Sequence, residues 1–136
     1  MAWHFAAGTP VYLQICSRIR ADILLGVYPP DTQIPSVRQL ACEAGVNPNT
    51  MQRAFTVLES EQLFVTRGTL GRFITTDVAV LDRARAVLRR ETVTRILSEA
   101  AAVGISPAEL IADIQACAAR EDAPADNTVT ERSDPT

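Results

Sequence analysis

The sequence predicts a mainly α fold with one small β-hairpin, and three observations support this. Apolar residues recur at helical spacing in four segments of the chain. A capping residue or capping box marks four helix starts, and three of them place a proline directly after the cap. Two short runs rich in β-branched and aromatic residues flank a loop with glycine at both ends, within residues 63–76. Helices joined by short turns, with a single hairpin among them, satisfy all three patterns.

The first predicted helix begins at Thr9 and Pro10, a capping residue followed by proline at the first helical position. It should end near Gly26, before a turn that contains two prolines. Arg18 and Arg20 lie off its apolar stripe, so we expect both to be solvated, with a contact to phosphate as the alternative. The stripe, with Cys16 beside it, consists of Tyr12, Ile15, Ile19 and Ile23.

Residues 34–63 predict two helices joined by a tight turn. Ser36 and Gln39 have the spacing of a capping box, in which each side chain bonds the backbone N–H of the other residue. Asn47, followed by proline, starts the second helix. Between the helices, Gly45 suits the left-handed conformation that closes a helix. The stretch therefore predicts a helix-turn-helix.

The second of these helices has one apolar and one polar face. The apolar stripe consists of Met51, Ala54, Phe55 and Leu58, and the polar side chains are Asn49, Thr50, Gln52, Arg53 and Thr56. No carboxylate occurs from Asn47 to Leu58. Amides, hydroxyls and guanidinium groups are what base edges and phosphates bind. The face therefore predicts a DNA recognition helix, with an ordinary polar helix face as the alternative.

The hairpin follows this helix directly, which makes the predicted domain a winged helix-turn-helix. Arg67 and Arg72 lie at the two bases of the hairpin loop, where a minor groove or a phosphate would be. A plain hairpin with solvated arginines is the alternative.

The C-terminal part predicts a helix over about 78–103 and a second one that begins with the capping pattern of Ser106, Pro107 and Glu109. Two helices cannot enclose a core of their own, so their apolar faces should be buried against a second copy of the chain. We expect a two-helix dimerisation arm. The residues predicted to form its interface are Leu81, Ala84, Leu88, Ile96, Leu110 and Ile114.

The predicted organisation has four parts. Residues 1–8 are an N-terminal extension, 9–76 the winged helix-turn-helix domain, 77–120 the helical dimerisation region and 121–136 a disordered acidic tail. The chain carries a net charge of −3, and the tail's five acids and one arginine account for −4, which leaves +1 for residues 1–120. A nearly neutral body predicts modest affinity for DNA of arbitrary sequence.

Several classes of protein are not expected. No apolar run approaches 18 residues and the N-terminus lacks a signal-peptide pattern, so we expect a cytoplasmic protein without a membrane span. Cys16, Cys42 and Cys117 are widely spaced, which favours reduced and mostly buried thiols without a metal site. His4 is the only histidine and lies in a terminus that we expect to be frayed. We therefore predict no catalytic residues, no cofactor and no metal.

Residues 10–75 resemble the N-terminal domain of the GntR family of bacterial transcription regulators. The resemblance rests on P-V-Y-L-Q-I, I-P-S-V-R-Q-L-A, G-V-N-P-N-T-M-Q-R-A-F, L-E-S-E-Q-L and R-G-T-L-G-R-F. The V-N-P-N-T-x-Q-R-A version with a short C-terminal part is similar to the YtrA-type subfamily. Gln62 departs from the family, which often has glycine there, and Arg72 departs from the usual end of the wing.

The resemblance implies a dimeric, repressor-like protein whose helix-turn-helix and wing meet DNA. Together with the polar face and the hairpin, it predicts these DNA-binding residues: Ser36, Arg38, Asn47, Asn49, Thr50, Gln52, Arg53, Arg67, Gly68 and Arg72. The predicted partners are double-stranded DNA with a palindromic operator and a second copy of the chain. Two alternatives stay open, namely a winged-helix module that binds a protein and a sensor with a small effector at the dimer interface.

Overall fold

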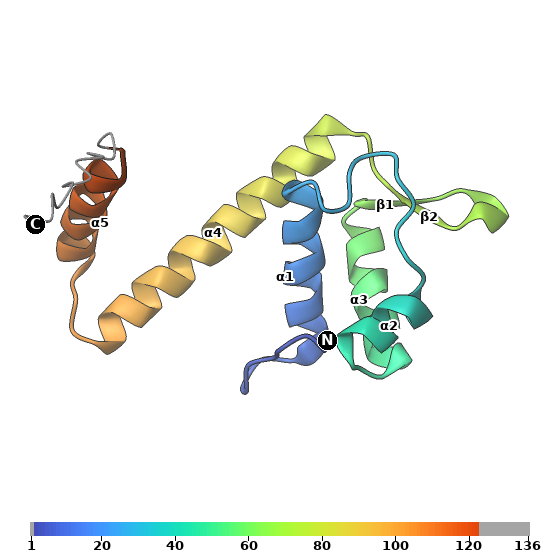
Figure 1. Ribbon diagram of the computed structural model, residues 1–136, viewed down its shortest axis with the longest axis horizontal. Coiled ribbons are helices and arrows are strands. Elements are labelled where there is room, and N and C mark those ends of the chain that lie inside the picture. Colours follow the sequence, from blue (N-terminus) through green and yellow to red (C-terminus); the bar gives the residue numbers. More distant parts are fainter. Residues whose placement is uncertain (1, 123–136) are drawn as a thin grey trace, which may run out of the picture. The chain divides into compact units, whose positions relative to one another are not determined.

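The computed structural model describes residues 2–122 of the 136-residue chain (Figure 1). The predicted fold class is confirmed. The predicted tail from residue 123 lies outside the described residues, whereas residues 121 and 122, also assigned to the tail, end the last helix. The elements are α1 (Val11–Leu24), α2 (Val37–Ala44), α3 (Pro48–Ser60), β1 (Phe64–Thr66), a 3-10 turn (Gly68–Leu70), β2 (Arg72–Ile74), α4 (Val78–Ala102) and α5 (Pro107–Asp122).

The chain divides into two compact units, one ending at Glu91 and the other beginning at Thr92. The first unit holds α1, α2, α3, the hairpin and the first half of α4. The second holds the rest of α4 and α5. The predicted boundary after residue 76 precedes α4, whose first turns contribute the buried residues Val80 and Ala84 to the core of the first unit.

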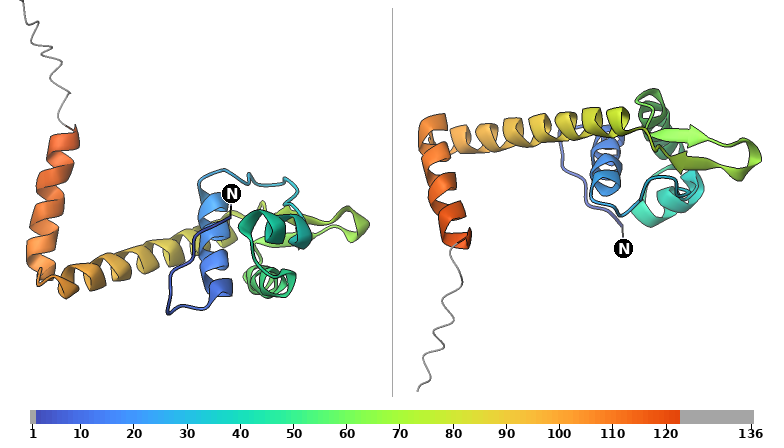
Figure 2. Two further views of the ribbon diagram at one scale, coloured as in Figure 1. Left: turned by 60° about the horizontal axis from the view of Figure 1, so that its bottom comes forward. Right: turned by 90° about the horizontal axis from the view of Figure 1, so that it is seen from above.

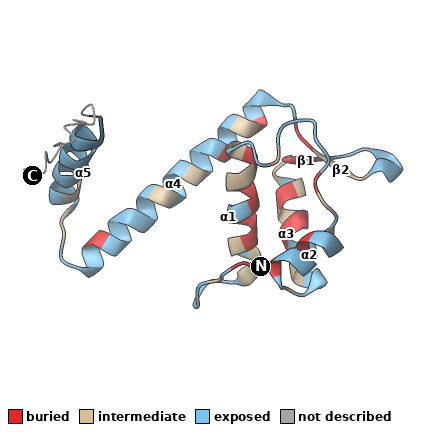
Figure 3. Ribbon diagram, viewed as in Figure 1, coloured by how far each residue is buried: buried red, intermediate tan, exposed pale blue. Residues whose placement is uncertain are grey.

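The core of the first unit lies where α1, α2 and α3 face one another, and Figure 3 shows the buried residues gathered on these faces. Phe55 of α3 is fully buried and its ring centroid lies 5.1 Å from that of Phe64 at the start of β1. The predicted stripe of α3 is buried throughout. In the stripe of α1, Tyr12 is only half-buried, while Ile15, Cys16, Ile19 and Ile23 are buried.

The helix-turn-helix begins and ends as predicted. The Oγ of Ser36 accepts the Gln39 N–H at 3.2 Å, and the Ser36 N–H donates to Oε1 of Gln39 at 2.9 Å. Gly45 closes α2 at φ 74°, and Asn47 caps α3. The prediction for Thr9 was wrong, because the carbonyl of Pro10 accepts the first bonds of α1 and makes Pro10 the N-cap.

The wing is a short antiparallel hairpin in which Phe64 pairs with Ile74 and Thr66 with Arg72. Its strands are shorter than predicted and are joined by the 3-10 turn. Figure 2 shows that the hairpin projects beyond the three helices. The segment 31–34 runs along the other edge of β2, with the Asp31 N–H donating to the Ile74 carbonyl at 2.9 Å and the Ile34 N–H to the Arg72 carbonyl at 3.0 Å.

The N-terminal segment packs on the domain, so the expectation of a frayed terminus was wrong from residue 2 onward. Trp3 is 7% exposed and its backbone N–H donates to the Ala44 carbonyl at 3.1 Å. The Arg18 guanidinium lies 4.1 Å from the centroid of the Trp3 ring. The Gln14 side chain bonds both backbone polar groups of Ala6. This segment therefore belongs to the compact unit rather than extending from it.

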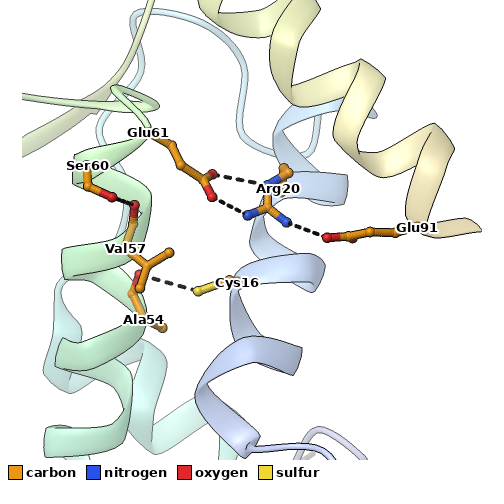
Figure 4. A network of polar contacts seen from close by, with 7 residues as sticks. All are labelled: Cys16, Arg20, Ala54, Val57, Ser60, Glu61 and Glu91. Atoms are coloured by element: carbon orange, nitrogen blue, oxygen red, sulfur yellow. Dashed lines mark hydrogen bonds and ion pairs between the residues drawn. The ribbon is translucent and has the colours of Figure 1, made fainter.

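Arg20 was expected to be solvated, and this was wrong: its side chain is 6% exposed. Figure 4 shows its guanidinium between two carboxylates. Nη2 and Nε of Arg20 donate to the two oxygens of Glu61 at 2.6 Å and 3.2 Å, and Nη1 lies 3.8 Å from Oε1 of Glu91 on α4. A long arginine side chain can be buried because these partners neutralise its charge.

The second unit contains two helices whose apolar side chains are largely exposed. The Oγ of Ser106 accepts the Glu109 N–H at 3.2 Å, as expected for a cap, and Pro107 is the first residue of α5. The large exposed apolar side chains within these helices are Val93, Ile96, Leu97, Ile111 and Ile114. Among residues 2–122, no helix is both long and apolar enough to span a membrane.

Candidate nucleic-acid interface

The exposed face of α3 carries the predicted base-reading residues. Asn49, Gln52 and Arg53 are exposed and Thr50 is half-buried. Oδ1 of Asn47 accepts the Asn49 N–H at 2.8 Å, so the Asn47 side chain is engaged as the helix cap. It retains its NH₂ group and further lone-pair capacity for a contact.

Arg53 is held against α1. Its guanidinium lies 3.9 Å from the ring centroid of Tyr12, a distance typical of cation–π stacking. Both residues line an open cleft of about 430 Å³, together with Asn49 and Thr50. Three predicted DNA-binding residues thus meet on one side of the unit. The aromatic residue among them, Tyr12, was assigned to the core stripe by its spacing.

A second cleft, of about 480 Å³, separates α2 from the wing. Ser36 and Arg72 line it, together with Gln39 and Gln33. Because the Ser36 hydroxyl accepts the capping hydrogen bond, it remains able to donate its proton to an incoming oxygen. Arg72 is half-buried, pairs with Glu59 of α3 and lies with its guanidinium 5.3 Å from the Phe55 ring centroid.

The wing tip is held by side chains from outside the hairpin. Arg67 pairs with Asp31 and stacks on Phe73 at 4.4 Å. Nε2 of Gln33 donates to the Leu70 carbonyl at 2.6 Å. Gly71 has φ 107°, and a Cβ there would lie 2.8 Å from the Gln33 amide, so the tip requires glycine at this position.

The two remaining predicted contacts are exposed. Arg38 lies on the first turn of α2, and Gly68 begins the 3-10 turn with φ 53° and open space around its Cα. The structure therefore divides the predicted DNA-binding residues among the α3 face, the α2 start and the wing, all within the first unit.

The predicted dimerisation residues fall into two groups. Ala84 is 7% exposed within the core of the first unit, and Leu81 packs against that core. Leu88 is half-buried. Ile96 and Ile114 are exposed, and Leu110 is half-buried. Burial within the chain already explains the apolar character of Leu81 and Ala84.

The expectation of mostly buried cysteines was wrong for two of the three. Cys42 and Cys117 are exposed, and only Cys16 is buried. Burial raises the pKa of the Cys16 thiol to about 11, so this thiol stays protonated at neutral pH. Within residues 2–122, no group of histidine, cysteine and acidic side chains has the arrangement of a metal site.

Sequence reasoning missed the carboxylates and the aromatic ring that hold the arginines of this interface. Asp31 and Glu59 are more than 10 residues from their arginine partners in sequence, so no helical or strand spacing signals the pairs. The aromatic-to-arginine stack on Tyr12 likewise joins two helices. A tight Pro-Pro-Asp turn before the helix-turn-helix was the only local signal near Asp31.

Comparison with known proteins agrees with this architecture. The family model for bacterial regulatory proteins of the gntR family matches residues 11–74. The HTH-type transcriptional regulator YhcF of Bacillus subtilis is 30% identical over 111 residues, which cover 82% of this chain and 92% of that protein. The HTH-type transcriptional repressor YtrA of the same organism is 29% identical over 100 residues, or 73% and 77% of the two chains.

A solved structure is similar to this chain over residues of both units. A GntR family transcriptional regulator from Listeria monocytogenes matches with a TM-score of 0.69 and 30% identity, covering 82% of this chain and 97% of the other. The similarity is therefore not confined to the helix-turn-helix.

Proposed function

The chain belongs to the GntR family of DNA-binding transcription regulators, and from this premise we propose that it is a homodimeric repressor of an inverted-repeat operator. The observation that carries the proposal is the polar face of α3 between Asn49 and Thr56, which offers amides, hydroxyls and a guanidinium without a carboxylate. Such a face matches the hydrogen-bonding edges of bases in a major groove.

Within this proposal, Asn49 and Gln52 read bases, because both side chains are exposed amides near the N-terminal end of α3. Arg53 is pre-oriented by its stack on Tyr12, so less conformational entropy is lost when it binds. Arg38 contacts guanine or phosphate from α2, and Arg72 and Ser36 take a phosphate at the cleft between α2 and the wing.

Dimerisation through the second unit follows from its exposed apolar side chains. Ile96, Leu97, Ile111 and Ile114 of the second unit are each at least 37% exposed. A second copy of the chain would remove these side chains from water. Two recognition helices in a two-fold symmetric dimer would then meet half-sites about one helical turn apart.

Repression is proposed because the relative YtrA is named a repressor. Binding at an operator would exclude other proteins from the same DNA, in the cytoplasm where bacterial DNA lies. A protein-binding role for the α3 face is less favoured, because its exposed residues include no aromatic or methionine anchor.

The decisive experiment selects bound sites from random and genomic DNA and reads them by sequencing. We expect enrichment of an inverted repeat with half-sites about 10 base pairs apart. A variant with Asn49→Ala and Gln52→Ala should keep its fold and its affinity for random duplex but lose that enrichment. If the wild-type chain enriches no sequence at moderate salt, the proposed function is wrong.

The dimer is tested separately by sedimentation of Ile114→Glu, which places a charge on the exposed apolar side of α5. We expect this variant to sediment as a monomer and to bind a full operator no better than a half-site. The matched control is Gln115→Glu, which adds the same charge at the neighbouring exposed position and should remain dimeric. Wild-type protein that is monomeric at micromolar concentration would contradict the proposed dimer.

A further inference from the structure

Both wing arginines are paired with carboxylates that lie outside the wing. Arg67 pairs with Asp31 of the loop between α1 and α2, and Arg72 pairs with Glu59 of α3. The two arginines are therefore not free cations in the DNA-free protein. Each positive charge of the wing is therefore accompanied by a negative charge at hydrogen-bonding distance.

The two carboxylates are presented by well-anchored backbone. The Asp31 N–H donates to the Ile74 carbonyl at 2.9 Å, which fixes Asp31 beside β2. Asp31 also has φ 63°, a left-handed conformation that aspartate and asparagine tolerate better than most residues. Glu59 lies on the last turn of α3, the same helix that carries the polar face. The fold therefore fixes the backbone positions of Asp31 and Glu59 beside the wing.

We propose that Asp31 and Glu59 are specificity-determining residues of the DNA interface, which act by reducing the affinity of the wing for DNA of arbitrary sequence. The inference rests on the proposed DNA-binding function. A phosphate must displace a carboxylate before Arg67 or Arg72 can bind it, and the displaced carboxylate then lies close to the phosphates and repels them.

The exposure of the pairs makes this exchange feasible. The Arg67 and Asp31 side chains are 42% and 59% exposed, and those of Arg72 and Glu59 are 29% and 34% exposed. Ion pairs at such exposure are weak, so DNA can open them when other contacts hold the protein in register. An operator supplies these contacts through the bases read by α3, whereas a random sequence does not.

The test measures binding of the full chain to a random-sequence duplex between 50 and 200 mM salt. Asp31→Asn and Glu59→Gln each free one arginine, so each should add about one phosphate contact. We expect about three- to tenfold tighter binding at 50 mM salt and a salt slope steeper by about 0.9. Because of the steeper slope, the gain in affinity of each variant over wild type should be about 3.5-fold smaller at 200 mM salt than at 50 mM salt.

The matched control is Glu43→Gln. Glu43 is an exposed carboxylate on α2 that forms no ion pair within residues 2–122, so its replacement changes the net charge equally without freeing an arginine. Its random-duplex affinity should change less than twofold, with an unchanged slope. Circular dichroism and thermal unfolding verify that every variant is folded before its binding is compared.

The two proposals fail differently. If the wild-type chain binds DNA while Asp31→Asn and Glu59→Gln bind random duplex no more tightly than Glu43→Gln, only the role of these carboxylates is refuted. An operator-to-random ratio that stays at the wild-type value in both variants refutes it as well. If neither wild type nor any variant binds duplex DNA, the proposed function and this inference are both refuted.

Discussion

Replacing Glu61 by glutamine should destabilise the first unit much more than replacing Glu91 by glutamine, although both carboxylates contact the same guanidinium. Glu61 holds Arg20 through two hydrogen bonds of 2.6 Å and 3.2 Å, whereas Glu91 approaches it at 3.8 Å. The Arg20 side chain is 6% exposed and cannot regain water when a partner is lost.

The expected magnitudes follow from this geometry. Removing one partner of a fully buried ion pair costs about 3–5 kcal/mol, because the other charge is left uncompensated. Glu61 is 36% exposed and Glu91 still lies near Arg20, so we expect about 2–3 kcal/mol for Glu61→Gln. Glu91 is 47% exposed and its contact is long, which predicts at most about 1 kcal/mol for Glu91→Gln.

The assay is urea unfolding at one protein concentration, followed by the fluorescence of Trp3. This residue is the only tryptophan of the chain and is buried in the same unit, so its signal reports unfolding there. The double variant Arg20→Met, Glu61→Gln should regain part of the stability lost in Glu61→Gln, because no charge is then left buried. Equal losses for Glu61→Gln and Glu91→Gln, or no recovery in the double variant, would refute the reasoning.

Further expected outcomes concern single positions. Gln62→Gly should raise the free energy of unfolding by about 0.5–1 kcal/mol, because Gln62 has φ 66°, a conformation that glycine adopts without strain. Gly45→Ala should lower the free energy of unfolding by more than about 1 kcal/mol, because the new Cβ would lie 2.9 Å from the Cβ of Ala2. Thermal unfolding measures both changes. Alkylation at pH 8, followed by mass spectrometry, should modify the exposed Cys42 rapidly and leave the buried Cys16 unmodified. Because folding raises the pKa of Cys16 to about 11, the protonated thiol contributes stability that is fully present below about pH 9 and is lost as the pH rises toward 11. Arg38→Ala should weaken operator binding by about 1–3 kcal/mol and relax specificity at one base pair, as measured by fluorescence anisotropy, whereas an equal loss on every sequence would make Arg38 a phosphate contact.

The sequence predicted the elements whose signals are local. The capping box of Ser36, the Asn47 cap and Gly45 each act within one helical turn, and the structure has all three in those roles. The apolar spacing of α3 likewise selected a face that is buried in full. Such features depend on residues within four positions of one another, so a single sequence carries enough information to find them.

The errors concern contacts between segments that are distant in sequence. Arg20 looked solvated because only the fold brings Glu61 to it, 41 residues later. Trp3 looked frayed because its partners, Ala44 and Arg18, belong to two different helices. The same reason hid the carboxylates beside the wing arginines, since side-chain pairing across a fold has no period in the sequence.

The segment 31–34 makes the connection between α1 and α2 a poor place to insert residues. Connections between helices are ordinarily the places where a chain accepts inserted residues. Here the connection between α1 and α2 is hydrogen-bonded along β2 and also carries Gln33, whose amide holds the tip of the wing. An insertion in that connection would shift the hairpin together with it, whereas the turn at Gly104 between α4 and α5 has open space around it. A peptide epitope or a labelling sequence is therefore better inserted at the turn that contains Gly104.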